Sequence, residues 1–226
     1  MPKVKVLPKR IEAWSFSRWR DYEQCPAKAK FKHIDKIKEP GNAAMDRGSA
    51  IHKLAEDFAG GKLKSMPLEL AKFKVKFTAL KKLTPQCEQE WAFNREWGRV
   101  GWFDQDCWCR IKVDVTHAKN AEATIIDHKT GRYKPGDPSY REQLELYALG
   151  GFLIHRKAAK IICKLWFIDS GDEEILIFER KDLEKLKAKW EDRTKAMLTD
   201  TRFAPTPGRY CTYCFHRKAN GGQCKF

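Results

Sequence analysis

The stretch AEATIIDHKTG, residues 121–131, contains the most informative pattern in the chain. Two β-branched isoleucines lead directly into Asp127, and Lys129 follows two positions later. Because residues i and i+2 of a strand point to the same face, we expect Asp127 and Lys129 to be neighbours on one side of a sheet. Packing alone does not require opposite charges at the end of an apolar strand. The pair is therefore a candidate functional site.

A second carboxylate precedes this pair by 13 positions. It is Asp114, near the end of the strand-like stretch CWCRIKVDV (107–115), and the turn-like THAKN (116–120) predicts a hairpin between the two strands. The two carboxylates are then expected to converge at neighbouring strand ends, where they repel unless a hard divalent cation lies between them. A lysine beside such a cation suits phosphodiester hydrolysis. The alternative is that both aspartates are solvent-facing residues at strand ends.

The remaining chain predicts the elements around this hairpin. Short segments rich in β-branched and aromatic residues predict strands near 88–96, 107–115, 123–129, 160–168 and 173–179. Apolar residues at three- and four-residue steps predict helices near 15–25, 41–61, 67–82, 137–154 and 181–200. Helices followed by a sheet with an inserted helix, and then a last helix, predict an α/β or mixed α+β fold.

Size and composition limit the classes of protein. The 226 residues, 42% of them hydrophobic, suffice for one well-cored domain. No apolar run approaches the length of a membrane span, and the basic N-terminus lacks the apolar core of a signal peptide. We therefore expect a cytoplasmic protein, in a bacterium or a phage-infected host cell, that does not bind membranes.

The net charge of +15 indicates a polyanionic partner, most simply nucleic acid. Lysines cluster in residues 28–38 and 62–82, which contain few acids. Aromatic residues available for base stacking are Trp14, Trp19 and Phe73, although each also fits a core position. The alternative is a charged surface that only keeps the protein in solution.

Four motifs, in the same order, resemble those of one known family; one of them is Asp114, the acidic residue before the signature. IIDHKTG resembles the (D/E)-X-K signature of the PD-(D/E)XK nuclease superfamily, in its RecB-like branch. RGSAIHKLAEDF (47–58) resembles the G-x-x-x-H helix of that branch, and QLELYA (143–148) resembles its Q-x-x-x-Y motif. The resemblance implies a restriction-endonuclease-like core, with a central mixed sheet flanked by helices.

The resemblance also implies roles for individual residues. His52, Asp114 and Asp127 would bind Mg²⁺ or Mn²⁺, and the catalytic residues would be Lys129, Asp127 and Asp114. The backbone carbonyl of His128 would be a further ligand, since its side chain is expected on the opposite face. Gln143 and Tyr147 would either contact the substrate or support the site. Glu56, one helical turn after His52, is a weaker candidate that can equally pair with Lys53.

Four of the eight cysteines stand in polar or turn-rich surroundings: Cys25, Cys211, Cys214 and Cys224. Four thiolates suit either an iron–sulfur cluster or tetrahedral zinc, and their spacing does not decide between the two. One of these cysteines lies near the N-terminus and three lie near the C-terminus. This arrangement resembles the cysteine staple of RecB-like nucleases such as AddB, which implies a 4Fe-4S cluster. His216 offers an alternative Cys₃His zinc site that would leave Cys25 unused.

The resemblance implies a metal-dependent DNA nuclease, most simply a single-strand exonuclease acting in recombination, repair or phage/CRISPR DNA processing. Any helicase would be a separate partner, because the chain contains no G-x-x-x-x-G-K-[ST] motif. The alternative function is a catalytically inactive nucleic-acid-binding module with a structural zinc site. We expect a single RecB-like domain, 1–226, with an N-terminal helix and basic segment (1–40), a nuclease core (41–200) and a cysteine-containing tail (201–226).

Overall fold

The computed structural model describes residues 10–226, and the chain divides into two compact units. The larger unit is Gly41–Ala188, and the smaller unit combines the described residues up to Pro40 with Lys189–Phe226. Among the described residues, no helix has the length and apolar character that crossing a membrane requires.

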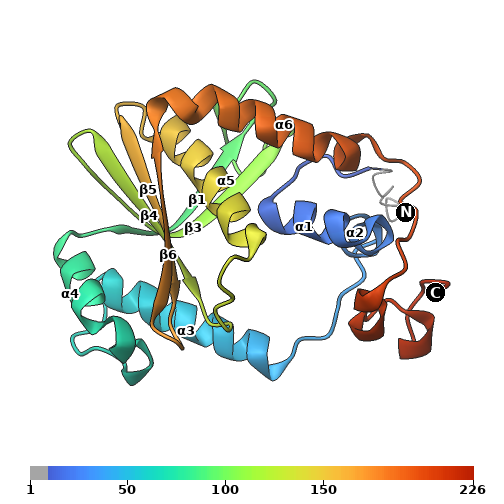
Figure 1. Ribbon diagram of the computed structural model, residues 1–226, viewed down its shortest axis with the longest axis horizontal. Coiled ribbons are helices and arrows are strands. Elements are labelled where there is room, and N and C mark those ends of the chain that lie inside the picture. Colours follow the sequence, from blue (N-terminus) through green and yellow to red (C-terminus); the bar gives the residue numbers. More distant parts are fainter. Residues whose placement is uncertain (1–9) are drawn as a thin grey trace, which may run out of the picture. The chain divides into compact units, whose positions relative to one another are not determined.

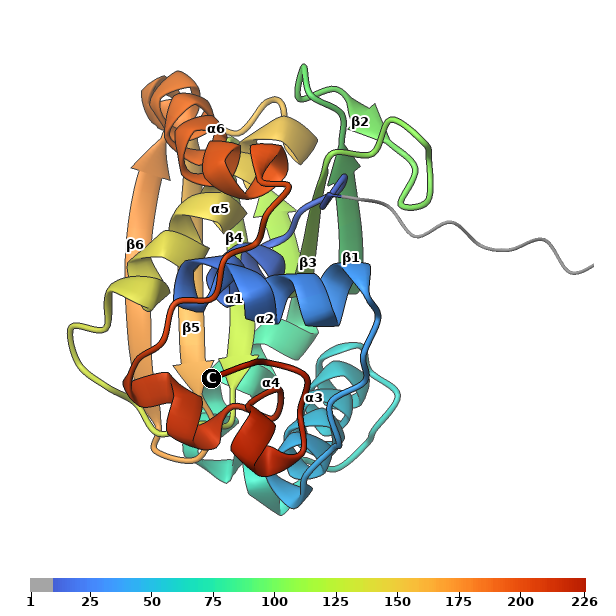
Figure 2. The ribbon, with the colours of Figure 1, turned by 90° about the vertical axis from the view of Figure 1, so that its right-hand side faces the viewer.

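The larger unit contains a mixed sheet of six strands in the order β2-β1-β3-β4-β5-β6, which Figure 2 shows. Only β4 and β5 are parallel, and the helix α5 connects them. All other neighbours are antiparallel. The strands are β1 (Gln86–Phe93), β2 (Arg99–Val100), β3 (Cys109–Lys119), β4 (Glu122–Lys129), β5 (Lys160–Phe167) and β6 (Asp172–Glu179). The sequence-based expectation of a mixed sheet flanked by helices is confirmed.

Helices cover both faces of this sheet (Figure 1). On one face α5 (Pro138–Ile154) packs closely, since a Cβ at Gly151 would lie only 2.7 Å from Cδ1 of Ile125. The next strand residue, Ile126, points to the other face. There it joins a buried cluster with α3 (Ala43–Ala59) and α4 (Lys74–Lys82). The cluster includes Ile51, Phe58, Phe73, Phe77, Leu80, Val115 and Trp166.

Two elements differ from the expected ones. The segment 67–82 is not one helix but a 3₁₀ helix η2 (Leu68–Phe73) followed by α4, because Phe73 leaves the helical conformation at φ −106° and ψ 19°. The segment THAKN does not form the turn. Four of its residues continue β3, and the chain reverses at Asn120, whose φ is 56°.

The smaller unit contains α1 (Phe16–Gln24), α2 (Pro26–Ala29), the π-helical turn η1 (Lys30–Ile34) and the part of α6 (Leu183–Thr199) that follows Ala188. Its core stacks the Trp14 and Trp190 rings with centroids 5.5 Å apart, and Trp19 meets Trp190 edge-on. Trp14, Trp19 and Phe73 are all buried, so their proposed use in base stacking was wrong.

Candidate active site

Asp114 and Asp127 lie side by side on the antiparallel strands β3 and β4. Val115 and Ile126 are paired in register, and each aspartate is the next residue of its strand beyond this pair. The expected hairpin is therefore present, but Asp114 lies within β3 and not at its end, because the strand extends to Lys119.

An irregularity in the sheet determines where Asp114 points. Ile111 faces α5, since its Cδ1 would lie 2.7 Å from a Cβ at Gly150, whereas Val115 belongs to the cluster with α3 and α4. Residues 111 and 115 would share a face in a regular strand, so β3 changes its facing between them. Glu88, in the register position opposite Asp114, has a left-handed φ of 51°. Asp114 lies at this change of facing.

Asp114 forms contacts that hold its carboxylate beside α3. Its Oδ2 accepts a hydrogen bond from the backbone N–H of His128 at 2.7 Å and lies 3.2 Å from Nδ1 of His52. Burial raises the pKa of Asp114, but the hydrogen bond with His52 and the charges of His52 and His128 outweigh it, so that pKa is lowered. The same hydrogen bond raises the pKa of His52.

Gly48 explains how α3 brings His52 to the strand. Asn42 caps α3 by accepting a hydrogen bond from the N–H of Met45, and Gly48 follows one turn before His52. A Cβ at Gly48 would lie 3.1 Å from Oγ1 of Thr130, immediately after β4. The glycine thus allows close approach of the helix to the strand end.

Asp127 is buried on the α5 side of the sheet, together with Lys129. Its Oδ2 lies 2.6 Å from Nζ of Lys129, whereas its Oδ1 accepts hydrogen bonds from Oη of Tyr147 at 2.5 Å and from Nε2 of Gln143 at 3.3 Å. Burial raises the pKa of Asp127, and the negative charge of Asp114 raises it further. The positive charge of Lys129 lowers this pKa, but the net shift is upward. The amide of Gln143 also donates to Oη of Tyr147 at 2.7 Å.

His128 lies on the opposite face from Asp127, as the strand period predicts. Its buried ring packs near Phe77 and Trp166, with centroids 5.3 and 5.9 Å away, and burial lowers its pKa to about 4. The sequence did not indicate that Nδ1 of this ring lies 3.6 Å from Oδ2 of Asp114. That proximity depends on the change of facing in β3.

Glu56 does not join the site. Its two carboxylate oxygens pair with Lys53 at 2.9 Å and with Lys62 at 3.1 Å. The pair with Lys53 is the alternative expected from the i, i+3 spacing, and the pair with Lys62 was not expected.

The donor set suits a divalent cation. Among the described residues, ligand atoms of His52, Asp114 and His128 form a group within 4.8 Å of one another. The 3.2 Å between His52 and Asp114 is close to the separation of about 3 Å between neighbouring ligands in an octahedron with bonds of about 2.1 Å. Asp127 is outside this group, and its buried Oδ2 pairs with Nζ of Lys129 at 2.6 Å.

The four candidate cysteines all belong to the smaller unit, and each is half-buried. Cys25 Sγ accepts the backbone N–H of Thr206 at 3.4 Å, so the cysteine after α1 lies beside the tail. Cys211 Sγ accepts the N–H of Gly208 at the same distance. Backbone N–H groups directed at sulfur are a common feature of cysteine ligands, so these residues fit a metal or cluster.

The alternatives are zinc sites on the four cysteines or on three cysteines with His216. In residues 10–226, no three cysteine sulfurs lie within 4.8 Å of one another. His216 is buried, with its Nε2 3.1 Å from Oε1 of Glu39, and its ring packs on Phe31. One of its ring nitrogens is paired with a carboxylate, as is common for histidines that bind a metal through the other nitrogen.

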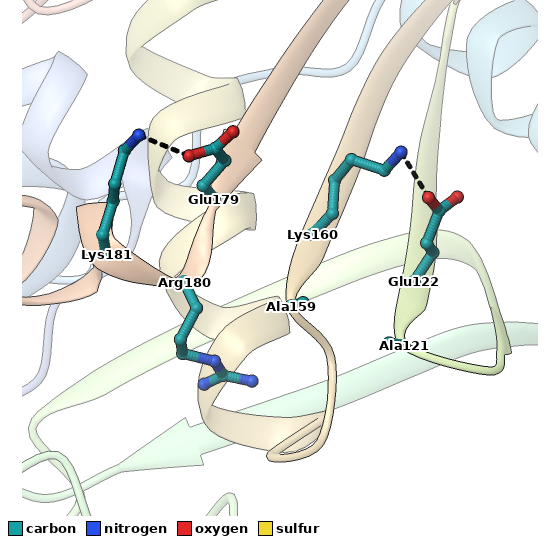
Figure 3. Close-up of a pocket in the computed structure, with 7 residues that line it drawn as sticks. All are labelled: Ala121, Glu122, Ala159, Lys160, Glu179, Arg180 and Lys181. Atoms are coloured by element: carbon teal, nitrogen blue, oxygen red, sulfur yellow. Dashed lines mark ion pairs between the residues drawn. The ribbon is translucent and has the colours of Figure 1, made fainter.

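A hollow of about 440 Å³ lies at the other end of the sheet (Figure 3). It is formed where β4 and β5 begin and β6 ends, so it is remote from Asp127 and Lys129 at the end of β4. Two ion pairs, Lys160 with Glu122 and Lys181 with Glu179, occupy its rim. This hollow is not part of the candidate active site.

The chain is similar to known proteins in sequence pattern and in fold. The family model described as the PD-(D/E)XK nuclease superfamily matches residues 13–106 and 110–219. A crystal structure of a candidate exonuclease from Eubacterium rectale is similar over 92% of this chain and 88% of its own, with 13% identity and a TM-score of 0.50. The protein SSO0001 is similar over 92% of this chain and 86% of its own, with 16% identity and a TM-score of 0.44. No curated protein matches the chain significantly in sequence.

Because the family model covers nearly the whole chain, the chain belongs to the PD-(D/E)XK nuclease superfamily. The likeness to the Eubacterium rectale structure concerns the fold, and it agrees with a restriction-endonuclease-like core.

Proposed function

We propose that the chain is a divalent-metal-dependent deoxyribonuclease of the RecB-like branch, with His52, Asp114 and Asp127 as ligands of Mg²⁺ or Mn²⁺. The observation that carries the proposal is the adjacency of Asp114 and Asp127 on paired strands, each with its own functional partner: His52 at 3.2 Å and Lys129 at 2.6 Å. When bound, such a cation lowers the pKa of a coordinated water and polarises the phosphoryl oxygens.

The side chains around the cation have separate tasks in this proposal. Lys129 supplies a positive charge at the mouth of the site, where it orients the water nucleophile or stabilises the negatively charged transition state. Tyr147 and Gln143 donate hydrogen bonds to Oδ1 of Asp127 and thereby direct its other oxygen, Oδ2, towards Lys129 and the cation. This geometry favours support of Asp127 over direct substrate contact for both α5 residues.

The proposed substrate is single-stranded DNA, degraded from its ends in recombination, repair or phage/CRISPR DNA processing. The net charge of +15 supports a polyanionic substrate. A separate helicase or recombination protein would supply unwound strands.

The proposed second cofactor is a 4Fe-4S cluster on Cys25, Cys211, Cys214 and Cys224. The backbone N–H bonds to the sulfurs of Cys25 and Cys211 support their use as metal or cluster ligands, and the choice of a cluster over zinc follows the resemblance to RecB-like nucleases. A cluster there would supply cross-linking: it would tie the residue that follows α1 to a tail with little core of its own.

The experiment that tests the substrate proposal compares two single strands of equal sequence, one linear and end-labelled, one circular, with Mg²⁺ or Mn²⁺. An exonuclease releases labelled mononucleotides or short fragments from the linear strand and leaves the circle intact. Cleavage of the circle at the same rate would show an endonuclease, and an RNA strand of the same sequence tests the preference for DNA.

A further inference from the structure

The tail of the smaller unit, residues 201–226, has an unusual surface. It contains five lysines and arginines and no aspartate or glutamate. Four of its aromatic side chains are exposed, although large apolar side chains are normally buried. They are Tyr210 (54% exposed), Tyr213 (89%), Phe215 (37%) and Phe226 (46%).

The tail is packed against the rest of the smaller unit, although these four rings are exposed. Phe203 is buried and meets Tyr22 edge-on at 6.2 Å, and His216 is buried against Phe31 at 5.2 Å. The backbone N–H of Cys224 also bonds the carbonyl of His216 at 2.7 Å, which folds the end of the chain back. The tail is therefore anchored at several points, and its remaining rings face outward.

The 3₁₀ helix η4 (Arg209–Tyr213) separates the tyrosines from the cysteines. In a 3₁₀ helix side chains three residues apart share one face, so Tyr210 and Tyr213 are on one face while Cys211 and Cys214 are on another. With a rise of about 2 Å per residue, the two tyrosines are roughly 6 Å apart along the axis. One short turn can thus direct thiolates to a cofactor and present two phenol rings to solvent.

Positive charge accompanies these rings. The Arg209 guanidinium lies 5.0 Å from the Tyr210 ring centroid, and Nζ of Lys225 lies 5.1 Å from that of Phe226. Within the described part of the chain, no carboxylate forms an ion pair with Arg209, Arg217, Lys218 or Lys225. The surface therefore offers aromatic faces and uncompensated cations in alternation.

We propose that this tail surface binds single-stranded nucleic acid, with bases stacked on Tyr210 and Tyr213 and with phosphates held by the adjacent arginines and lysines. Base–aromatic stacking together with a basic groove is the general mode of sequence-independent single-strand binding. The proposal rests on the proposed function and deepens it, because it assigns strand capture to the cysteine-containing tail. The charge of the tail, with five cations and no aspartate or glutamate, complements a phosphate backbone.

The test measures binding without cleavage, in the Asp127→Ala background of the full chain. Fluorescence anisotropy compares a labelled oligothymidylate with a base-free oligonucleotide of the same length at fixed salt. We expect the parent to prefer the strand with bases by at least about fivefold, since each stacked base contributes about 1–3 kcal/mol. The double variant Tyr210→Ala/Tyr213→Ala should bind both strands with similar, low affinity.

Matched variants separate stacking from folding. Tyr213→Phe should bind like the parent, and Phe103→Ala removes an equally exposed ring (88%) next to Asp104 and should change nothing. Unchanged affinity of the double variant would overturn the proposal and would point to a protein partner for this surface. An equal loss for both strands would also overturn it. Cleavage by the wild-type chain is measured separately, so a failure of the nuclease assignment is distinguishable from a failure here.

Discussion

Oη of Tyr147 donates a hydrogen bond of 2.5 Å to Oδ1 of Asp127, joining α5 to the end of β4. The contact fixes the orientation of a buried carboxylate whose second oxygen lies 2.6 Å from Lys129. Because hydrogen bonds to charged groups are worth about 1.5–3 kcal/mol, this phenol is expected to matter for catalysis even without touching substrate.

Tyr147→Phe should lower kcat/KM for DNA about 10- to 100-fold, since it removes that hydrogen bond and retains the ring. Tyr140→Phe is the matched control, because Tyr140 lies on the same helix and its Oη only accepts the N–H of Lys134 at 3.1 Å. Wild-type kcat/KM in Tyr147→Phe would show that the phenol has no positioning role.

Metal affinity should fall as the pH falls, because a proton and the metal compete for His52. The hydrogen bond with Asp114 raises the pKa of His52 above 6.5 in the metal-free protein, so below that raised pKa one proton must leave for each cation bound. Titration calorimetry with Mn²⁺ should show about a tenfold loss of affinity per pH unit in this range and a plateau above it. His52→Gln should bind the cation more weakly, with an affinity that depends less on pH. A pH-independent affinity in the wild-type chain would remove His52 from the ligand set.

The sequence predicted the parts of the site that depend on strand periodicity. The i, i+2 spacing placed Asp127 and Lys129 on one face, and the i, i+4 spacing placed Gln143 and Tyr147 together; the structure shows both pairs in contact. The direction of the Asp114 side chain could not be predicted from the sequence, because it depends on a change of facing in β3, opposite Glu88, that no local sequence pattern indicates. Such irregularities result from packing between elements distant in sequence.

The aromatic residues illustrate the same limit. Trp14 and Trp19 had no local signal that distinguishes core from surface, and their burial follows from contact with Trp190, more than 170 positions away. Tyr213 likewise could only be recognised as exposed once the fold of the tail was known.

Asp21→Asn should destabilise the smaller unit at neutral pH by about 1–3 kcal/mol. Burial raises the pKa of Asp21, but the hydrogen bond with His33 and the charges of Lys28 and Lys32 lower it overall. Because the pKa of Asp21 is lower in the folded state, its carboxylate stabilises the fold fully at pH values above the unfolded-state pKa of about 3.9. This stabilisation is lost as the pH falls from there through the folded-state pKa.

Urea unfolding from pH 7 to pH 2, followed by tryptophan fluorescence, measures this contribution to the free energy of unfolding. The difference between wild type and Asp21→Asn should shrink below about pH 4. Asp35→Asn, which removes a more exposed ion pair with Lys30, serves as the control with a small effect. A constant difference across this pH range would contradict the assignment to Asp21.

Anaerobically purified protein should be brown and contain iron and acid-labile sulfide in near-equal amounts. Cys211→Ala should lose the colour and lower the midpoint of thermal unfolding, because the proposed cluster cross-links the tail to the residue that follows α1. Cys163→Ala should keep the cluster, since Cys163 is a buried residue of β5. Stoichiometric zinc in a colourless, active preparation would contradict the cluster and leave the nuclease proposal intact.

The most direct test of the central claim, a metal-dependent nuclease centre at Asp114 and Asp127, is the cleavage rate of Asp127→Ala on end-labelled single-stranded DNA with Mg²⁺ or Mn²⁺. Cleavage should be abolished while DNA binding is largely retained, because the basic surface is unchanged. Lys129→Ala should still bind Mn²⁺ but cut at least about 100-fold more slowly, a loss of about 2.7 kcal/mol of transition-state stabilisation. Degradation of DNA by Asp127→Ala at the wild-type rate would contradict the assignment of the active site.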